Sequence, residues 1–409
     1  MASTLKLGKG NWGVKEDSLL AYSDQNNNFI PLPFDFSRAS SATVVNKAGL
    51  VESVTSGLPR IDFSDDTNGA LLLEPQSTNL VTYSESYNFW AKTSANVTSN
   101  AATSPEGVQN ASKIVEASGL SFHFILSYTS VVSGSTTFSF YAKAAERTSV
   151  SAFLSQGGNN GANFDLSAET ATAQGTGNTA SIESVGNGWY RCIVSNNGSA
   201  QVANQVRIGI QNGALNSYVG DGTSGIYIWG AQLENLPYTT SYIPTTGATA
   251  TRVRDICTGA GNASTFNSTE GVLYAEIAAL ADDGTLRVLS ISDGTSNNRI
   301  QLRYDSSSNS ITLIYRVSGG SFVVLTKVVS NTEDFIKLSF RWKSGDFALW
   351  INGVEEQTSS NTTMLPIDTL NRLDFNDSTG ASDFYGNAKQ VIVFPTALSD
   401  AELEALTTI

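Results

Sequence analysis

A repeated pattern of turn followed by strand, in the middle third of the chain, most constrains what this sequence can fold into. Residues 189–194 have the period of two that a half-buried β-strand needs, and the Gly and Asn residues just before them suit a turn. The stretch GDGTSGIYIWGAQLE at 220–234 follows the same plan, with a glycine-rich turn and then a strand. Many short strands separated by such turns are typical of a β-sandwich, so the sequence predicts one in this region.

The composition of the chain agrees with an all-β protein of several domains. With 409 residues the chain is too long for one ordinary core, and 40% hydrophobic residues are enough to build two or three. Only 15% of the residues are charged, while Ser, Thr, Asn and Gly are abundant. That balance is typical of short strands and polar turns rather than of long helices, so we expect tandem antiparallel β-sandwiches.

Charge, hydropathy and cysteine content argue against several classes of protein. The formal net charge of −13, without a basic cluster, would repel a phosphate backbone, so we expect no nucleic-acid partner. No apolar run reaches the roughly 18 residues of a membrane span, and the N-terminus has no apolar segment of signal-peptide length. Cys192 and Cys257 belong to no CxxC pair, which argues against a zinc site and against a disulfide framework.

Residues 1–78 predict an extended N-terminal segment interrupted by prolines. Proline cannot donate a hydrogen bond to a sheet, so the short runs ATVV and ALLLE in this segment should be edges or extended wraps. The prolines concerned are Pro31, Pro33, Pro59 and Pro75. Because such a segment lacks a core of its own, we expect it to be irregular, to lean on a neighbouring subunit and to serve in attachment.

Residues 79–250 predict a jelly-roll sandwich. Strand-like runs such as TTFSFYAKA and QVRIGIQ are separated by Gly, Ser and Asn turns at the spacing of a sandwich. In SFHFILSY at 121–128, His123 lies on one face of the strand, and the other face carries Phe122, Phe124, Leu126 and Tyr128. We expect the aromatic face to be core and His123 to be exposed.

Residues 259–409 predict a β-meander that ends in a short helix. Strand-like runs occur at 299–304, 311–317, 321–329, 336–342 and 347–351. Asn352 and Gly353 follow the last run and are the strongest hairpin signal in the chain, because both central residues of a type I′ turn need positive φ. Ser399 with Glu402 three residues later predicts the capped start of a helix. We expect this unit to fold alone.

Three motifs in the N-terminal part of the chain carry a resemblance to a known group of proteins. They are R-A-S-x-A-T at 38–43, P-R at 59–60 and L-L-x-E-x-x-x-T-N-L at 71–80. The segment that contains them resembles one that often precedes a jelly-roll module in bacteriophage virion proteins, and residues 79–250 are similar to their carbohydrate-binding-like modules. Residues 259–409, with KSGDFALWINGVE and LSDAELEALT, resemble the laminin-G-like, concanavalin-type sandwich.

The resemblance implies a protein on the surface of a virion, in a tail or head fibre, assembled in the host cytoplasm. Its partners would be other virion subunits and host surface polysaccharide, and phage fibres that resemble it are commonly homotrimers. The implied function is non-catalytic binding of host cell-surface glycans. A purely structural fibre or capsid-decoration protein is the first alternative, and a glycan depolymerase is the second.

The residue patterns do not support an enzyme. His123 is the single histidine, and no G-x-S-x-G elbow accompanies it. The G-x-G-x-x-G at 220–225 is followed by a strand, whereas a dinucleotide site needs a helix there. Adjacent acids lie in or beside turns, where neighbours point to opposite faces; these are Asp65 with Asp66, Asp282 with Asp283, and Glu355 with Glu356.

An exposed aromatic ring beside amide groups is the feature that sugar binding normally uses, because the C–H face of a sugar stacks on the ring. In FALWI at 347–351, the alternation puts Trp350 opposite the more apolar face, next to Asn352 of the turn. These two residues are the candidate glycan ligands, although packing of the ring in the interior is the commoner arrangement for an aromatic residue. We expect no cofactor, with a structural calcium ion at turn carboxylates as an open alternative.

Overall fold

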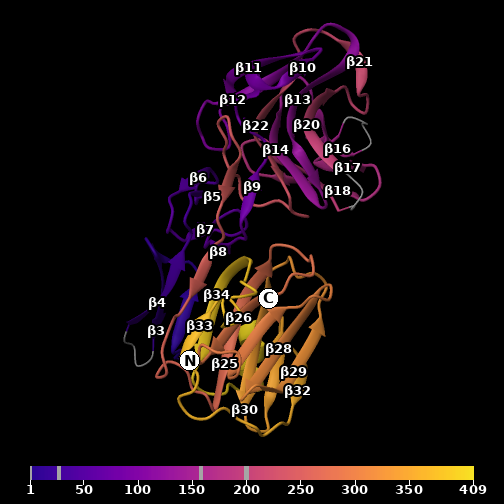
Figure 1. The fold of residues 1–409 in the computed structure, drawn as a ribbon. Helices are drawn as coiled ribbons and strands as arrows, with labels where there is room; N and C mark the ends of the chain where they lie inside the picture. The colour runs from indigo at the N-terminus through magenta and orange to yellow at the C-terminus, as the bar shows by residue number, and fades with distance from the viewer. Residues whose placement is uncertain (1, 25–28, 156–159, 198–201) are drawn as a thin grey trace. The chain divides into compact units, whose positions relative to one another are not determined.

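The computed structural model describes residues 2–24, 29–155, 160–197 and 202–409 (Figure 1). Antiparallel strands are almost the only regular secondary structure in this part of the chain, and α1 (Asp400–Thr407) is its single α-helix. The strands form two separate compact units. Unit 1 comprises residues up to 41, 54–75 and 254–409, and unit 2 comprises residues 42–53 and 76–253. The expectation of an all-β fold with tandem antiparallel sandwiches and one short C-terminal helix is confirmed.

Unit 1 pairs a twelve-stranded sheet with a five-stranded sheet. Nine strands of the larger sheet run in the order β24 (Ile256–Thr258), β4 (Ile30–Ser37), β3 (Ser18–Ser23), β1 (Leu5–Gly8), β34 (Gly386–Phe394), β25 (Glu270–Ala279), β30 (Ile336–Lys343), β31 (Phe347–Ile351) and β32 (Val354–Ser359). Its other three strands are β2 (Gly13–Lys15), β7 (Arg60–Asp62) and β8 (Ala70–Leu73). The smaller sheet has the order β29 (Gly320–Val328), β28 (Ser310–Val317), β27 (Arg299–Tyr304), β26 (Arg287–Ser292) and β33 (Arg372–Asp374).

The N-terminal residues are part of this sandwich, which differs from the three-part division inferred from the sequence. β1 lies inside the larger sheet, because it pairs with β3 on one side and with β34 on the other. Leu5 and Leu7 of β1 are buried in the same core as the C-terminal strands. Residues 1–78 therefore form no separate segment, because they are divided between the two units. The expectation that residues 259–409 fold alone stays an untested prediction.

The prolines of the N-terminal segment nevertheless lie where their missing N–H groups predict. Pro31 and Pro33 are in β4 and pair with β3, but β24 covers only residues 35–37 on the other side of β4. Pro59 directly precedes β7, and Pro75 follows β8. Each proline therefore occupies an edge or an end of a strand, where no ladder hydrogen bond from its nitrogen is needed.

Both faces of the larger sheet in unit 1 carry buried apolar side chains, and α1 covers part of the second face. One face packs on the smaller sheet and forms the main core. The other face packs under α1, where Leu398 and Leu403 join a second cluster of buried apolar side chains. The backbone N–H of Ser399 donates to Glu402 Oε2 at 2.8 Å, so the predicted capping box fixes the start of the helix.

Unit 2 is a sandwich of a seven-stranded and a six-stranded antiparallel sheet. The first contains β10 (Ala91–Thr93), β13 (Gly119–Ser133), β20 (Val202–Gln211), β15 (Ser149–Phe153), β16 (Gly161–Asp165) and β17 (Thr170–Gln174) in this order, with β21 (Ser217–Gly220) beside β13. The second has the order β11 (Ala95–Ala102), β12 (Ala111–Glu116), β22 (Gly225–Glu234), β14 (Thr136–Ala144), β19 (Trp189–Asn196) and β18 (Asn178–Ser184). Two two-stranded sheets complete the unit, the hairpin of β5 (Ala42–Val45) with β6 (Val51–Val54) and the long-range pair of β9 (Ser77–Asn79) with β23 (Ala250–Arg252).

A buried ionic network connects the sequence motifs of unit 1. Arg38 donates to Asp255 at 3.0 Å, and Arg60 donates both to Asp255 at 2.5 Å and to Glu74 at 2.6 Å. Burial by itself would lower the pKa of Arg60, but the carboxylates of Asp255 and Glu74 raise it above its ordinary value. The arginines of the R-A-S and P-R motifs and the glutamate of the third motif are therefore structural residues.

We predict that Asp255→Asn destabilises unit 1 by about 3–5 kcal/mol, because two buried guanidinium groups would then share one uncharged amide. Urea unfolding, monitored by hydrogen exchange in peptides of unit 1, measures the change in the free energy of unfolding. The control is Asp65→Asn, since the side chain of Asp65 is 62% exposed and pairs with Lys389 at the surface. Asp65→Asn should lower the free energy of unfolding of unit 1 by no more than about 1 kcal/mol. Equal effects of the two changes would contradict a structural role of the network.

Candidate functional site

The outward face of the seven-stranded sheet in unit 2 carries an unusual set of aromatic, basic and amide side chains. Ile125 of β13 and Ile208 of β20 pair with each other and point into the core, so their neighbours along both strands point outward. The register sets Phe124 opposite Gly209, and Gly209 opposite Ser151 of β15. Phe153 of β15 lies opposite Arg207. Three adjacent strands therefore bring these residues together.

The structure reverses the faces that we expected for β13. His123 is 1% exposed, whereas Phe122 on the supposed core face is 56% exposed. The imidazole Nδ1 lies 2.7 Å from the carbonyl oxygen of Ser94, and Nε2 lies 3.2 Å from that of Tyr218. His123 thus fills a polar niche inside the sandwich. The physical reason is that Ile125, on the same face as His123, belongs to the core with its cross-strand partner.

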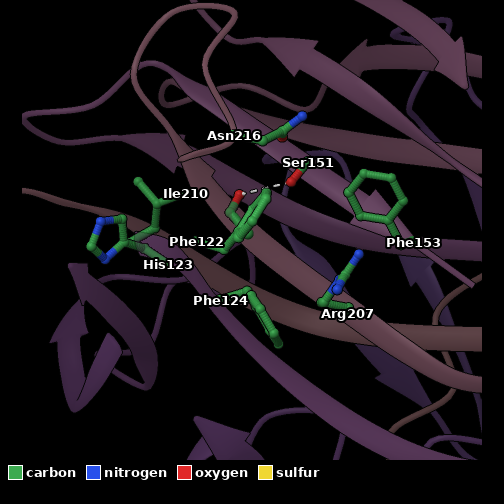
Figure 2. Close-up of a pocket in the computed structure, with 9 residues that line it drawn as sticks. Phe122, His123, Phe124, Ser151, Phe153, Arg207, Ile210 and Asn216 are labelled. Carbon is green, nitrogen blue, oxygen red and sulfur yellow. Dashed lines mark hydrogen bonds between the residues drawn. The ribbon is translucent and has the colours of Figure 1, made fainter. Parts of the chain in front are cut away.

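A shallow hollow of about 100 Å³ lies on this outward face and is called the sheet pocket below (Figure 2). Its lining residues are Phe122, His123, Phe124, Ser151, Phe153, Arg207, Gly209, Ile210 and Asn216. Figure 2 shows the ring of His123 directed away from the other labelled side chains. Gly209 keeps the floor open, because a Cβ atom there would lie 2.7 Å from Ser151 Oγ. A typical small-molecule pocket is several times larger, so the sheet pocket suits part of a larger ligand.

Arg207 lies between two phenylalanine rings in the sheet pocket (Figure 2). Its guanidinium carbon is 4.7 Å from the ring centre of Phe124 and 4.6 Å from that of Phe153, within the range of cation–π contacts. Among the described residues no carboxylate pairs with Arg207, and the remaining positions contain no Asp or Glu. Partial burial lowers the pKa of Arg207. The pocket therefore holds a positive charge without a counter-ion from the protein.

An amide group lies beside the basic and aromatic side chains of the sheet pocket. The side-chain nitrogen of Gln211 donates to Asn216 Oδ1 at 2.6 Å, which orients the Asn216 amide. Across the part of the chain that the structure describes, the amide nitrogen of Asn216 has no hydrogen-bond acceptor. Ser151 Oγ donates to the Gly209 carbonyl over a long 3.4 Å, so this hydroxyl is also available to a ligand. The pocket thus combines aromatic faces, a cation and hydrogen-bonding groups.

The structure does not support the two ligand residues expected from the sequence. Trp350 is only 6% exposed, because α1 covers this face of β31 and brings Leu403 into the same apolar cluster. Asn352 is exposed, but it forms the predicted hairpin turn with Gly353, with φ angles of 49° and 84°. Its Oδ1 accepts the backbone N–H of Lys337 at 3.0 Å. The ring is therefore a core residue, and the asparagine stabilises a turn.

The adjacent acids singled out in the sequence each have a structural partner. Asp283 pairs with Arg287, Glu356 with Lys327, and Asp65 and Asp66 both with Lys389. Asp282 accepts hydrogen bonds from Ser308 and Asn309, and Glu355 lies 4.0 Å from Arg341. Each of these carboxylates therefore contacts a basic side chain or hydrogen-bond donors of the fold.

Other kinds of site have less support in the structure. Within residues 2–24, 29–155, 160–197 and 202–409, no three His, Cys, Asp or Glu side chains gather as they would around a metal ion. A structural calcium ion stays an untested prediction. Cys192 and Cys257 are both buried and free. No helix in the described residues has the length and hydropathy to cross a membrane. A second hollow, in unit 1, is lined mainly by residues 263–268 and offers neither an exposed aromatic ring nor a cation.

Comparison with known proteins gives a family for part of the chain. Residues 261–404 match the model of the family described as the Concanavalin A-like lectin/glucanases superfamily. The C-terminal part of the chain is therefore concanavalin-like, and the match covers less than half of the whole sequence. No curated protein sequence matches the chain at a significant level.

Several solved structures are similar to parts of the chain at low identity. The CBM40 of the Ruminococcus gnavus IT-sialidase is 18% identical over 37% of this chain and 93% of its own, with a TM-score of 0.31. Domain 4 of AbnA, a GH43 extracellular arabinanase from Geobacillus stearothermophilus, is 14% identical over 42% and 82%, with a TM-score of 0.32. Domains LG4-5 of the mouse laminin alpha1 chain are 10% identical over 79% and 94%, with a TM-score of 0.24. At these values the structures carry no argument about the site.

We predict that Trp350→Ala lowers the stability of unit 1 by about 3–5 kcal/mol, because it leaves a cavity under α1. Trp350→Phe should cost less, since the indole N–H has no hydrogen-bond acceptor among the described residues and its loss leaves no partner unsatisfied. Thermal unfolding measures both changes. Phe322→Ala is the control, because Phe322 is 42% exposed in the same unit and its loss should change stability little. A Trp350→Ala variant of unchanged stability would contradict the buried position.

Proposed function

We propose that this protein binds glycans, and that the sheet pocket of unit 2 is the binding site. The observation that carries the proposal is the set of outward side chains, in which Phe122 presents a largely exposed ring beside Arg207 and Asn216. A sugar ring has C–H faces that stack on an aromatic ring and hydroxyl groups that bind amides and cations. Other exposed apolar side chains extend the surface along β13 and β21, namely Leu120, Tyr128 and Val219.

The biological setting that we propose is the surface of a bacteriophage virion, in a tail or head fibre that recognises host polysaccharide. Support comes from the resemblance of the N-terminal motifs to the segment that precedes such modules in virion proteins. Three residues of those motifs, Arg38, Arg60 and Glu74, belong to the buried ionic network, so the resemblance concerns residues that hold the scaffold together. Assembly in the host cytoplasm is part of the same proposal.

We predict that Phe122→Ala lowers glycan affinity about tenfold or more, without loss of stability, because the exposed ring has little packing to lose. The measurement is binding of the full chain to an array of host surface polysaccharides, with thermal unfolding in parallel. Phe89→Ala is the matched control, since Phe89 is 68% exposed in the same unit but lies outside the sheet pocket. Strong glycan binding by both the Phe122→Ala and the Phe124→Ala variant would show that the binding site lies outside the sheet pocket.

The purified full chain also allows the two alternative functions, a depolymerase and a purely structural protein, to be tested. We propose a non-catalytic protein because the acids of the chain that come in adjacent pairs are each engaged by basic side chains or hydrogen-bond donors of the fold. Incubation with host polysaccharide should therefore release no reducing ends. Reproducible release that is lost on changing one of these acids to alanine would favour the depolymerase. A chain that binds no glycan on a broad array would favour the purely structural fibre or decoration protein.

We further propose that the protein acts as a homotrimer beside other virion subunits. A shallow polar site gains little free energy for each copy, because it exchanges hydrogen bonds with water for hydrogen bonds with protein. Several copies that engage one surface multiply the effective affinity. Light scattering of the full chain at micromolar concentration should give three times the 43.4 kDa of one chain. A stable monomer would restrict oligomerisation to the assembled virion.

A further inference from the structure

Arg207 is the feature of the sheet pocket that glycan binding in general does not explain. A neutral sugar needs an aromatic face and hydrogen-bonding groups, and Phe122, Ser151 and Asn216 already offer these. A charged guanidinium at a partly buried position costs free energy of desolvation, which the lowered pKa of Arg207 reflects. Arg60, by contrast, offsets this cost with the carboxylates of Asp255 and Glu74.

The neighbours of Arg207 leave its N–H groups available. Phe124 of β13 and Phe153 of β15 contact the guanidinium from the strands on either side of β20. Aromatic rings stabilise the charge but accept no in-plane hydrogen bond. The guanidinium nitrogens have no acceptor among the described residues, and each of them keeps some exposure to solvent. The donors that point away from the two rings are therefore free for a ligand.

Acids of the protein are too distant to be the missing partner. On the same face of the sheet, Asp165 pairs with Ser149, which is four residues along β15 from Phe153. At about 3.3 Å per residue this separation is roughly 13 Å, beyond the Debye length of about 8 Å at physiological salt. Asp165 is also engaged with Ser167 at 2.6 Å. The same screening weakens the repulsion that a net charge of −13 would exert on an acidic ligand at the pocket.

We propose that the sheet pocket recognises a sugar that carries a carboxylate, and that Arg207 is the residue that binds the carboxylate. This inference rests on the proposed glycan-binding function and adds the chemical class of the ligand. The planar guanidinium presents two parallel N–H groups that match the two oxygens of a carboxylate. The rings of Phe124 and Phe153 hold the guanidinium in place, so little side-chain entropy is lost on binding. Phe122 then provides the face on which the sugar ring stacks.

The test compares acidic polysaccharides of bacterial surfaces with the same polymers after chemical reduction of their carboxyl groups to hydroxymethyl groups. The reduced polymers keep the sugar ring and linkage, so the pair differs only in the carboxylate. We expect the full chain to bind the acidic form about 10- to 100-fold more tightly, the range expected for a charge-assisted hydrogen bond. Sulfated dextran is the third ligand, and it distinguishes a carboxylate site from a general anion site.

Two variants of Arg207 and one control make the test specific. Arg207→Gln should remove the preference, so that both forms of the polymer bind alike, and Arg207→Lys should keep part of it, because lysine retains the charge without the planar fork. Lys47→Gln is the control, since it changes the net charge equally from an exposed turn of the same unit. Thermal unfolding and retained binding of the reduced polymers show that the variants fold.

The outcomes separate this inference from the proposed function. Binding that depends on Phe122 but ignores carboxyl reduction would overturn the carboxylate proposal and leave glycan binding intact. Sulfated dextran bound as tightly as the acidic polymers would overturn it in favour of a general anion site. If Lys47→Gln also removes the preference for the acidic polymer, the preference comes from the net charge of the protein. That result would equally contradict a role of Arg207. Absence of binding to every polymer would overturn the proposed function itself.

Discussion

The buried network of Arg38, Arg60, Glu74 and Asp255 is the interaction on which the architecture of unit 1 depends. These residues come from distant parts of the sequence, and all four side chains are almost fully removed from solvent. The backbone N–H of Glu74 donates to Asp255 as well, at 2.9 Å, and Arg38 also donates to the carbonyl oxygen of Thr55. A buried charge is tolerated only when its partners are present, so each segment must adopt its position for the others to be stable.

This network has a consequence for how the chain is divided. The chain passes between the two units near positions 41, 53, 75 and 253. Arg38, Arg60, Glu74 and Asp255 each lie close in sequence to one of these positions, so the ionic contacts fix unit 1 near where the chain leaves it. On the unit 2 side, Asn79 has a similar role for hydrogen bonding, because its amide donates to the carbonyl oxygens of Ala231 and Ile243. The N-terminal motifs are thus explained by structure rather than by catalysis.

The sheet pocket follows from ordinary strand geometry combined with one unusual choice of residues. Strand alternation requires an outward face, and most outward positions on β15, β16, β17 and β20 are small or polar. On β13 and β15 that face instead has phenylalanines, which contact the guanidinium of Arg207 across β20. Gly209 has no side chain beside these rings, which leaves a hollow where a Cβ atom would crowd Ser151. Stacking, charge and space are therefore concentrated at one point of this sheet.

Much of the fold could be predicted from local sequence. The Asn352–Gly353 turn, the capping box at Ser399 and the proline positions at strand edges each depend on the backbone of a few adjacent residues. The positions of the C-terminal strands were predictable for the same reason, because period-two alternation is a local pattern. The joining of β1 to β34 was not predictable in this way, since nothing in the sequence of β1 identifies a partner near the opposite end of the chain.

The candidate site could be predicted from the sequence only in part. By itself the sequence determined that residues 121–128 form a strand with two different faces, and that Trp350 and Asn352 lie at a hairpin. Only the tertiary structure decided that His123 faces inward and Phe122 outward, and that α1 covers Trp350. The physical reason is that alternation fixes which side chains share a face, whereas burial depends on what packs against that face. That information lies in residues distant in the chain, and here it also brought Arg207 between Phe124 and Phe153.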